Sequence, residues 1–245
     1  MADPTTKRER RESARRERAE LQRRLARWKR VRGLALRIGL TLVVVGALGS
    51  ALLLTRARSP KSGPEYVNVA RTVNPALLSG ILTDRPPWPA NTEALPQRLE
   101  AIGLPALASQ GTLLHIHQHL DLYVAGQPIT IPADIGIAET ASGVLFSPIH
   151  THDTSGIIHV ESPTVRPFTL GEFFDVWGVR FTSDCIGGNC NGGDARLRVY
   201  VDGDLATGDP AEIRLTSHEE ILVTYGTRAQ LPSPIPSSYT FPIGI

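Results

Sequence analysis

The chain has 245 residues and a net charge of only +2 at pH 7, but its charges are distributed unevenly. Residues 1–37 contain 14 Lys and Arg against 5 Asp and Glu, whereas the rest of the chain contains 12 against 19. The basic segment has no interleaved aromatic residues and no nucleic-acid-binding motif, which argues against a nucleic-acid partner. The sequence also contains no phosphate loop, no nucleotide fingerprint and no Ser-His-Asp order.

The N-terminal part is predicted to anchor the chain in a membrane. Residues 1–32 form a basic segment whose Arg, Glu, Ala and Leu content favours a helix. Residues 33–55 follow, with no charged side chain between residues 38 and 54, and are long enough to cross a hydrocarbon core of about 30 Å. We therefore expect a transmembrane helix rather than a buried core helix. The Lys and Arg excess before it predicts a single-pass protein of the cell membrane, with a cytoplasmic N-terminus and an extracytoplasmic C-terminal part.

Two alternatives concern this N-terminal part. A cleaved signal peptide is disfavoured, because the basic region is long and residues 54–59 offer no small-x-small cleavage site. Residues 7–32 either bind anionic lipid head groups or act only as a topology signal. Residues 56–65 are rich in Pro, Ser and charged residues and are predicted to be a linker.

Residues 66–245 are predicted to form one extracytoplasmic domain. A helix is expected at residues 92–102, closed by Gly103, and a second after Thr169, which forms a capping box with Glu172. Asp202 and Gly203 indicate a hairpin, and the Pro-rich tail from Leu231 is expected to lack regular structure. Alternation of apolar and polar residues predicts strands at residues 114–124, 129–131, 143–149, 156–161, 196–201, 212–215 and 220–225.

These elements predict a mainly β fold. We expect an antiparallel β sandwich or small barrel with one or two short helices. In the full chain this domain would be preceded by the basic N-terminal helix and the transmembrane helix.

The most informative feature is a concentration of histidines. Six of the seven lie within 45 residues, namely His115, His117, His119, His150, His152 and His159. On a strand, His115, His117 and His119 share one face, with neighbours about 6.6–6.8 Å apart. Adjacent members can converge on one ion, but the outer two cannot easily do so without a bulge. We therefore expect two of these three, completed by a ligand from the second group.

Zinc and copper(II) accept such nitrogen ligands. Copper(I) is disfavoured because Met1 is the only methionine and neither cysteine lies among the histidines. Asp121, Asp153 and Glu161 are expected to orient the rings. A hydrogen-bonded histidine face without metal and a pH-responsive or proton-relay site are the alternatives.

Two further features complete the site prediction. His218 is expected at a surface turn, and joins the histidine site only if the sheet order brings that turn to the same end. Cys185 and Cys190 are predicted to form a disulfide, since the domain is expected outside the membrane, with metal binding by the pair as the alternative.

Four segments carry a resemblance to other proteins. Residues 114–124 (HxHxH), 131–137, 150–163 (HTHD and IIHVESP) and 168–174 resemble an uncharacterised group of bacterial and archaeal membrane-anchored proteins. These proteins have a His-rich extracytoplasmic β domain and no established activity. The resemblance implies one coherent domain and leaves the function open.

The sequence thus predicts a membrane-anchored extracytoplasmic domain that binds Zn or Cu(II) for sensing, delivery or storage. One alternative is a metalloenzyme whose ion keeps an open position for water, with Glu161 or Asp153 as general base. The other is an interaction or pH-responsive module without metal.

Overall fold

The computed structural model describes residues 73–245, which belong to one compact unit, Ser62–Ile245. The predicted basic segment (1–32), transmembrane helix (33–55) and linker (56–65) lie outside the described residues. Within residues 73–245, no helix is both long and apolar enough to cross a membrane.

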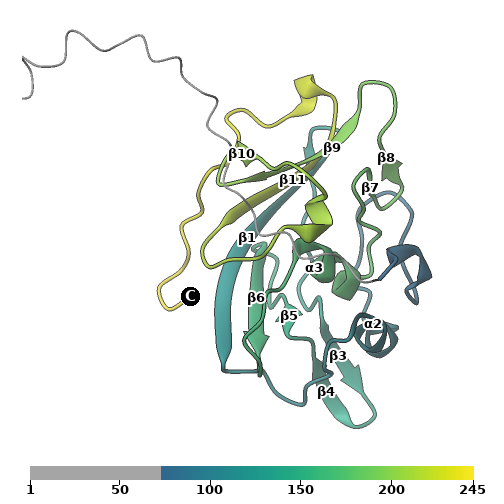
Figure 1. Ribbon diagram of the computed structural model, residues 1–245, viewed down its shortest axis with the longest axis vertical. Coiled ribbons are helices and arrows are strands. Elements are labelled where there is room, and N and C mark those ends of the chain that lie inside the picture. The colour runs from purple at the N-terminus through teal and green to yellow at the C-terminus, as the bar shows by residue number, and fades with distance from the viewer. Residues whose placement is uncertain (1–72) are drawn as a thin grey trace, which may run out of the picture. The chain divides into compact units, whose positions relative to one another are not determined.

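A seven-stranded sheet forms the centre of the fold (Figure 1). Six strands follow one another in the order β10-β9-β11-β1-β6-β5, and β2 pairs with the end of β1. All neighbours are antiparallel except β1 and β11, which run parallel. The strands are β1 (Leu114–Val124), β2 (Gln127–Pro128), β5 (Ile149–His150), β6 (Ile157–Ser162), β9 (Arg196–Val201), β10 (Asp204–Leu205) and β11 (Glu220–Gly226).

Two small hairpins stand apart from this sheet. The first pairs β3 (Ile137–Thr140) with β4 (Gly143–Phe146). The second pairs β7 (Cys185–Ile186) with β8 (Asn189–Cys190) and carries the Cys185–Cys190 disulfide, which confirms the predicted bond. Short 3-10 helices complete the described elements, as η1 (Pro75–Leu77), η2 (Pro210–Glu212) and η3 (Arg228–Gln230).

Two α-helices lie on one side of the large sheet (Figure 1), α2 (Leu95–Ile102) and α3 (Leu170–Trp177). The predicted capping box is confirmed, because the Thr169 hydroxyl accepts from the Glu172 N–H and the Glu172 carboxylate accepts from the Thr169 N–H. α2 begins at Leu95, three residues after the predicted start, with Pro96 in its first turn, and Gly103 ends the helix in the left-handed conformation as expected.

The two faces of the sheet have different surroundings. Residues such as Leu120, Ile158 and Val223 point to the helix side and pack in one hydrophobic core with Phe173 and Trp177 of α3. The histidines of β1 alternate with these apolar residues and therefore point to the opposite side. The C-terminal segment, residues 231–245, runs along that opposite side (Figure 1).

The predicted sandwich or barrel is replaced by an open mixed sheet, whose apolar face is covered by helices and loops and which does not close into a barrel. The chain between β1 and β11 is long, so β11 is free to enter beside β1 in either direction. The predicted hairpin at Asp202 and Gly203 is present, and both residues have positive φ as a tight two-residue turn requires.

Three predicted strands differ from those observed. Residues 129–131 are not a strand, because pairing with β1 ends at Pro128. The single strand predicted at 143–149 is two strands, separated by Ser147 and Pro148. The strand predicted at 212–215 is absent, because Glu212 ends the 3-10 helix η2, which the Asp209 side chain caps by accepting from the Ala211 N–H, and only Arg214 makes a β-bridge.

Candidate metal site

Three histidines form a row across β1, β6 and the edge strand β5. His117 of β1 is paired in register with His159 of β6, and His159 is paired with His150 of β5. Residues directly opposite one another on adjacent strands point to the same face. The three imidazoles therefore lie side by side, with ring centroids 4.6 Å apart for His117 and His159 and 5.6 Å apart for His159 and His150.

A second row supplies a carboxylate and a further imidazole. His115 of β1 is paired in register with Glu161 of β6. His152 follows β5 and brings its ring to 4.5 Å from that of His159. The six side chains fall into two overlapping groups that could each hold a metal ion, and His159 and Glu161 belong to both. We call the six together the histidine cluster, which consists of His115, His117, His150, His152, His159 and Glu161.

Ligand atoms within the histidine cluster are close together. The Nε2 atoms of His115 and His117 are 3.1 Å apart, and those of His150 and His152 are 3.2 Å apart. Glu161 places Oε1 3.3 Å from His115 Nε2 and Oε2 3.9 Å from His150 Nε2. No Lys or Arg among residues 73–245 forms an ion pair with this buried carboxylate.

The hydrogen bonds of His150 fix its ring for metal binding. Its Nδ1–H donates to the Ser147 carbonyl at 3.0 Å, which leaves the Nε2 lone pair facing the cluster. Metal-ligating histidines commonly donate their other ring N–H to a carbonyl in this way. The Gln110 amide donates to Nε2 of His150 and of His152, at 3.3 and 2.9 Å. Both nitrogens are therefore acceptors, as metal ligands must be.

Three cluster histidines are held neutral by their surroundings. Burial, followed by the neighbouring imidazoles, lowers the pKa of His117 and of His150 to about 4 and that of His159 to about 3. His159 is 8% exposed, and its Nδ1 makes no hydrogen bond although it lies 3.4 Å from Glu161 Oε1. A buried, neutral and unpartnered ring nitrogen is available to a metal ion.

His119 has different partners. Its Nδ1 lies 2.7 Å from Glu220 Oε2, and its Nε2–H donates to the Ser155 carbonyl at 3.0 Å. Although burial opposes the charged ring, the hydrogen bond and charge of Glu220 raise the pKa of His119. Tyr239 from the C-terminal segment stacks on the ring at 3.7 Å. His119, Asp121 and Glu220 form a third metal-capable group, but both nitrogens of His119 are already engaged.

The remaining predicted residues lie near the cluster without joining its metal-capable groups. His218 is exposed in a turn with φ 64°, where its N–H donates to the His117 carbonyl and its ring contacts Phe241. Asp153 is exposed, and hydrogen bonds from the Ser155 side chain and from the Ser155 N–H lower the pKa of the Asp153 carboxyl. Gly156 has φ 87°, and a side chain there would lie 2.6 Å from the Leu120 carbonyl, so glycine lets this turn approach His119.

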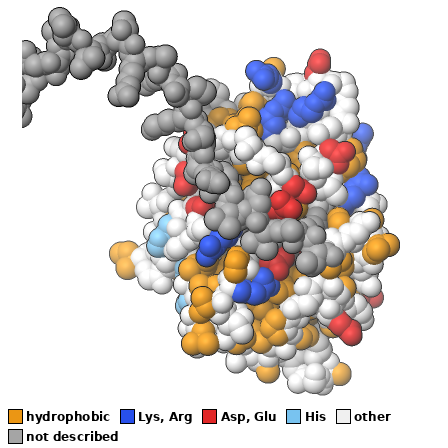
Figure 2. Space-filling view, viewed as in Figure 1, with side chains coloured by type: hydrophobic (Ala, Val, Ile, Leu, Met, Phe, Trp, Pro, Cys, Tyr) orange, Lys and Arg blue, Asp and Glu red, His pale blue; other side chains and the backbone are white. Residues whose placement is uncertain are grey.

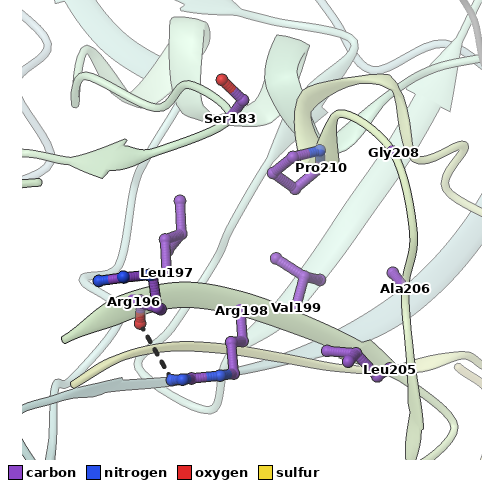
Figure 3. Close-up of a pocket in the computed structure, with 9 residues that line it drawn as sticks. All are labelled: Ser183, Arg196, Leu197, Arg198, Val199, Leu205, Ala206, Gly208 and Pro210. Carbon is purple, nitrogen blue, oxygen red and sulfur yellow. Dashed lines mark hydrogen bonds between the residues drawn. The ribbon is translucent and has the colours of Figure 1, made fainter. Parts of the chain in front are cut away.

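A pocket elsewhere on the domain lacks such ligands. Leu197 and Val199 of β9 point into it, and the Arg198 guanidinium donates to the Arg196 carbonyl at its rim (Figure 3). No histidine or carboxylate lines it. The visible histidine side chains of the domain lie instead at one edge of the face drawn in Figure 2. The chemistry-bearing residues are thus those of the histidine cluster.

Comparison of the chain with known proteins adds no relative. No protein-family model, curated protein or solved structure matches it. The resemblance to the group of membrane-anchored proteins therefore stays a prediction, and the function must be argued from the site.

Proposed function

We propose that the chain is a membrane-anchored extracytoplasmic protein that binds Zn²⁺ or Cu²⁺ through the histidine cluster, for sensing, delivery or storage. One observation carries the proposal. Five imidazoles and one carboxylate, which has no Lys or Arg ion-pair partner among residues 73–245, meet on one sheet face, with ligand atoms close together. Nitrogen-rich sites of this kind suit zinc and copper(II).

Exposure at the cluster favours an exchangeable ion over a purely structural one. The side chain of His115 is 55% exposed and His152 is exposed, whereas His117, His150 and His159 are buried. Solvent and a partner protein can reach an ion held at such an edge. Sensing and delivery require this access, and a structural zinc site is commonly closed by four protein ligands.

The location in the proposal rests on the N-terminal sequence. The uncharged residues 38–54 and the preceding Arg-rich segment favour a single-pass anchor with residues 7–32 near anionic lipid. The Cys185–Cys190 disulfide supports an oxidising compartment for the domain.

Metal analysis of the full chain in detergent micelles tests the proposal. The protein is stripped with a chelator, dialysed against Zn²⁺ or Cu²⁺, and its bound metal is counted by mass spectrometry. We expect at least one ion per chain, and a lower metal content in the double variant His150→Ala with His159→Ala. The matched control is His218→Asn, because asparagine tolerates the positive φ of this turn. Absence of metal from the wild-type protein would overturn the proposal.

A further inference from the structure

The histidine cluster contains two matched pairs of ligands. In each pair, His115 with His117 and His150 with His152, the Nε2 atoms are 3.1 to 3.2 Å apart. Two nitrogens bound to one tetrahedral zinc ion at 2.0–2.1 Å are about 3.3 Å apart. Each pair therefore already matches one edge of a coordination sphere.

One ion cannot use both pairs without movement of the side chains. The metal-capable groups each contain ligand atoms that all lie within 4.8 Å of one another, and the two pairs fall into different groups. Ligands on opposite sides of a single ion are at most about 4.2 Å apart, given metal–nitrogen bonds near 2.1 Å. The arrangement thus has two centres instead of one.

Glu161 lies between these two centres. Its Oε1 is nearest to His115 Nε2, at 3.3 Å, and its Oε2 faces His150 Nε2, at 3.9 Å. A carboxylate with its two oxygens turned toward different ligand pairs is arranged to bridge two ions. Two-metal sites of proteins typically hold their ions about 3.5–4 Å apart.

His159 adds a nitrogen between the pairs. Its ring centroid is 4.6 Å from that of His117 and 4.5 Å from that of His152. Its Nδ1 is buried and has no hydrogen-bond partner, although Glu161 Oε1 lies 3.4 Å away, so this nitrogen is free to bind an ion. A third ligand for one of the two ions is therefore available.

We propose that the histidine cluster binds two divalent ions bridged by Glu161, one on His115 and His117 and the other on His150 and His152. The inference rests on the proposed metal-binding function and deepens it. Each ion has two histidine nitrogens and one carboxylate oxygen, His159 completes one of the spheres, and water fills the remaining positions. The pair of ions then lies at the solvent-exposed edge of the cluster.

Stoichiometry and spin coupling test the inference in the full chain in detergent micelles. At saturating Zn²⁺ we expect two ions per wild-type chain by mass spectrometry, and one ion per chain in either His115→Ala or His152→Ala. With Cu²⁺ we expect an electron paramagnetic resonance signal of two coupled copper ions. Glu161→Gln is expected to remove that coupling, because the amide does not bridge the ions.

The control variant concerns the third metal-capable group. Asp121→Asn changes the His119, Asp121 and Glu220 group and leaves the histidine cluster intact, so it should still bind two coupled ions. A loss of one ion in Asp121→Asn would place the second ion there and overturn the inference.

The remaining outcomes separate the two proposals. A single ion in the wild-type chain at saturation overturns the two-ion inference and leaves the metal-binding function standing. Two ions without spin coupling overturn the bridge. No bound ion overturns both. Because the coupling is measured on the wild-type protein, the test does not depend on whether each variant folds.

Discussion

His117 and His119 lie two residues apart on the same face of β1, yet they have opposite chemical environments. Burial and the nearby imidazoles of His115, His218 and His152 lower the pKa of His117 to about 4. Around His119, the hydrogen bond and charge of Glu220 outweigh burial and raise the pKa. One ring is neutral in a cluster of ligands, and the other is held by a carboxylate, a carbonyl and a stacked tyrosine.

The neighbouring strands cause this difference. At His117, β6 presents another histidine in register, and at His119, β11 presents Glu220 on the other side of β1. A histidine whose two nitrogens are both hydrogen bonded stabilises the fold, whereas one facing unpartnered ligands is available for binding. The position of a histidine on β1 therefore sets the face to which it points, and the residues of the adjacent strands set whether its ring nitrogens are hydrogen bonded or available to an ion.

Replacing His119, whose two ring nitrogens are both hydrogen bonded, should give the largest effect on stability. His119→Ala leaves the buried Glu220, which is 1% exposed, without its cationic partner. Loss of one member of a buried ion pair typically costs about 3–5 kcal/mol of unfolding free energy. Urea denaturation measures the loss, and metal binding to the folded fraction should be unchanged.

His117→Ala is the matched variant, and it should affect metal affinity more than stability. It removes a neutral ring without a charged partner, so the expected loss of stability is smaller while metal affinity falls. Equal stability losses in the two variants would contradict the assignment of His119 as the structural histidine.

Metal addition should raise the stability of the folded chain through the histidine cluster. An ion that binds only the folded chain raises the unfolding free energy by about 4 kcal/mol at a thousandfold excess over its Kd. We expect urea denaturation to show this increase in the wild-type and His119→Ala proteins, and a smaller increase in Glu161→Gln, in which the ions keep only their histidine ligands. An equal stabilisation in Glu161→Gln would mean that the Glu161 carboxylate is not a ligand of the bound ion.

Local patterns in the sequence predicted much of the fold. Alternation located β1, β6, β9 and β11, and the Thr169 and Glu172 capping box located α3. The shared face of His115 and His117 agrees with the register of β1 with β6, whereas His159 and Glu161, and not His150 or His152, join these two in one metal-capable group. These features depend on side-chain period and on residues close in sequence.

The sequence could not predict partners that meet across long separations. Glu220 reaches His119 only because β11 lies parallel to β1, and Tyr239 reaches it only through the path of the C-terminal segment. Gln110 lies before β1 in a segment without periodicity, and its contacts with His150 and His152 depend on the whole sheet order. Strand order and direction are set by tertiary packing, which alternation does not report.

Acidification should lower the unfolding free energy through the cluster histidines, whereas the contribution of His119 is lost only as the pH rises. The folded pKa values of His117, His150 and His159 lie below the ordinary 6.5, so the unfolded chain binds more protons as the pH falls below 6.5. Stability then decreases toward about pH 4, by up to about 1.4 kcal/mol per pH unit for each histidine. The raised pKa of His119 acts oppositely, because its contribution is complete below 6.5 and is lost as the pH rises through that raised value.

Urea denaturation of the metal-free protein at several pH values measures this dependence. His159→Gln should flatten the decrease between about pH 6.5 and pH 4, because one neutral histidine no longer takes up a proton on unfolding. His119→Gln should instead change the slope above pH 6.5. The same slope in wild type and His159→Gln would mean that His159 binds its proton equally in the folded and the unfolded chain.

The smallest effect is expected at Tyr239, and it tests whether the C-terminal segment stabilises His119 without affecting the histidine cluster. The rings of Tyr239 and His119 stack with centroids 3.7 Å apart and planes 5° apart, and Phe241 packs against the edge of Tyr239. Tyr239→Ala should lower the unfolding free energy by about 1 kcal/mol, the usual value of an aromatic contact, and Tyr239→Phe should retain it. Metal affinity should stay constant in both variants, because Tyr239 contacts His119 and no ligand of the cluster. If Tyr239→Ala lowers the free energy of metal binding by more than it lowers the free energy of unfolding, the C-terminal segment contributes to the metal site.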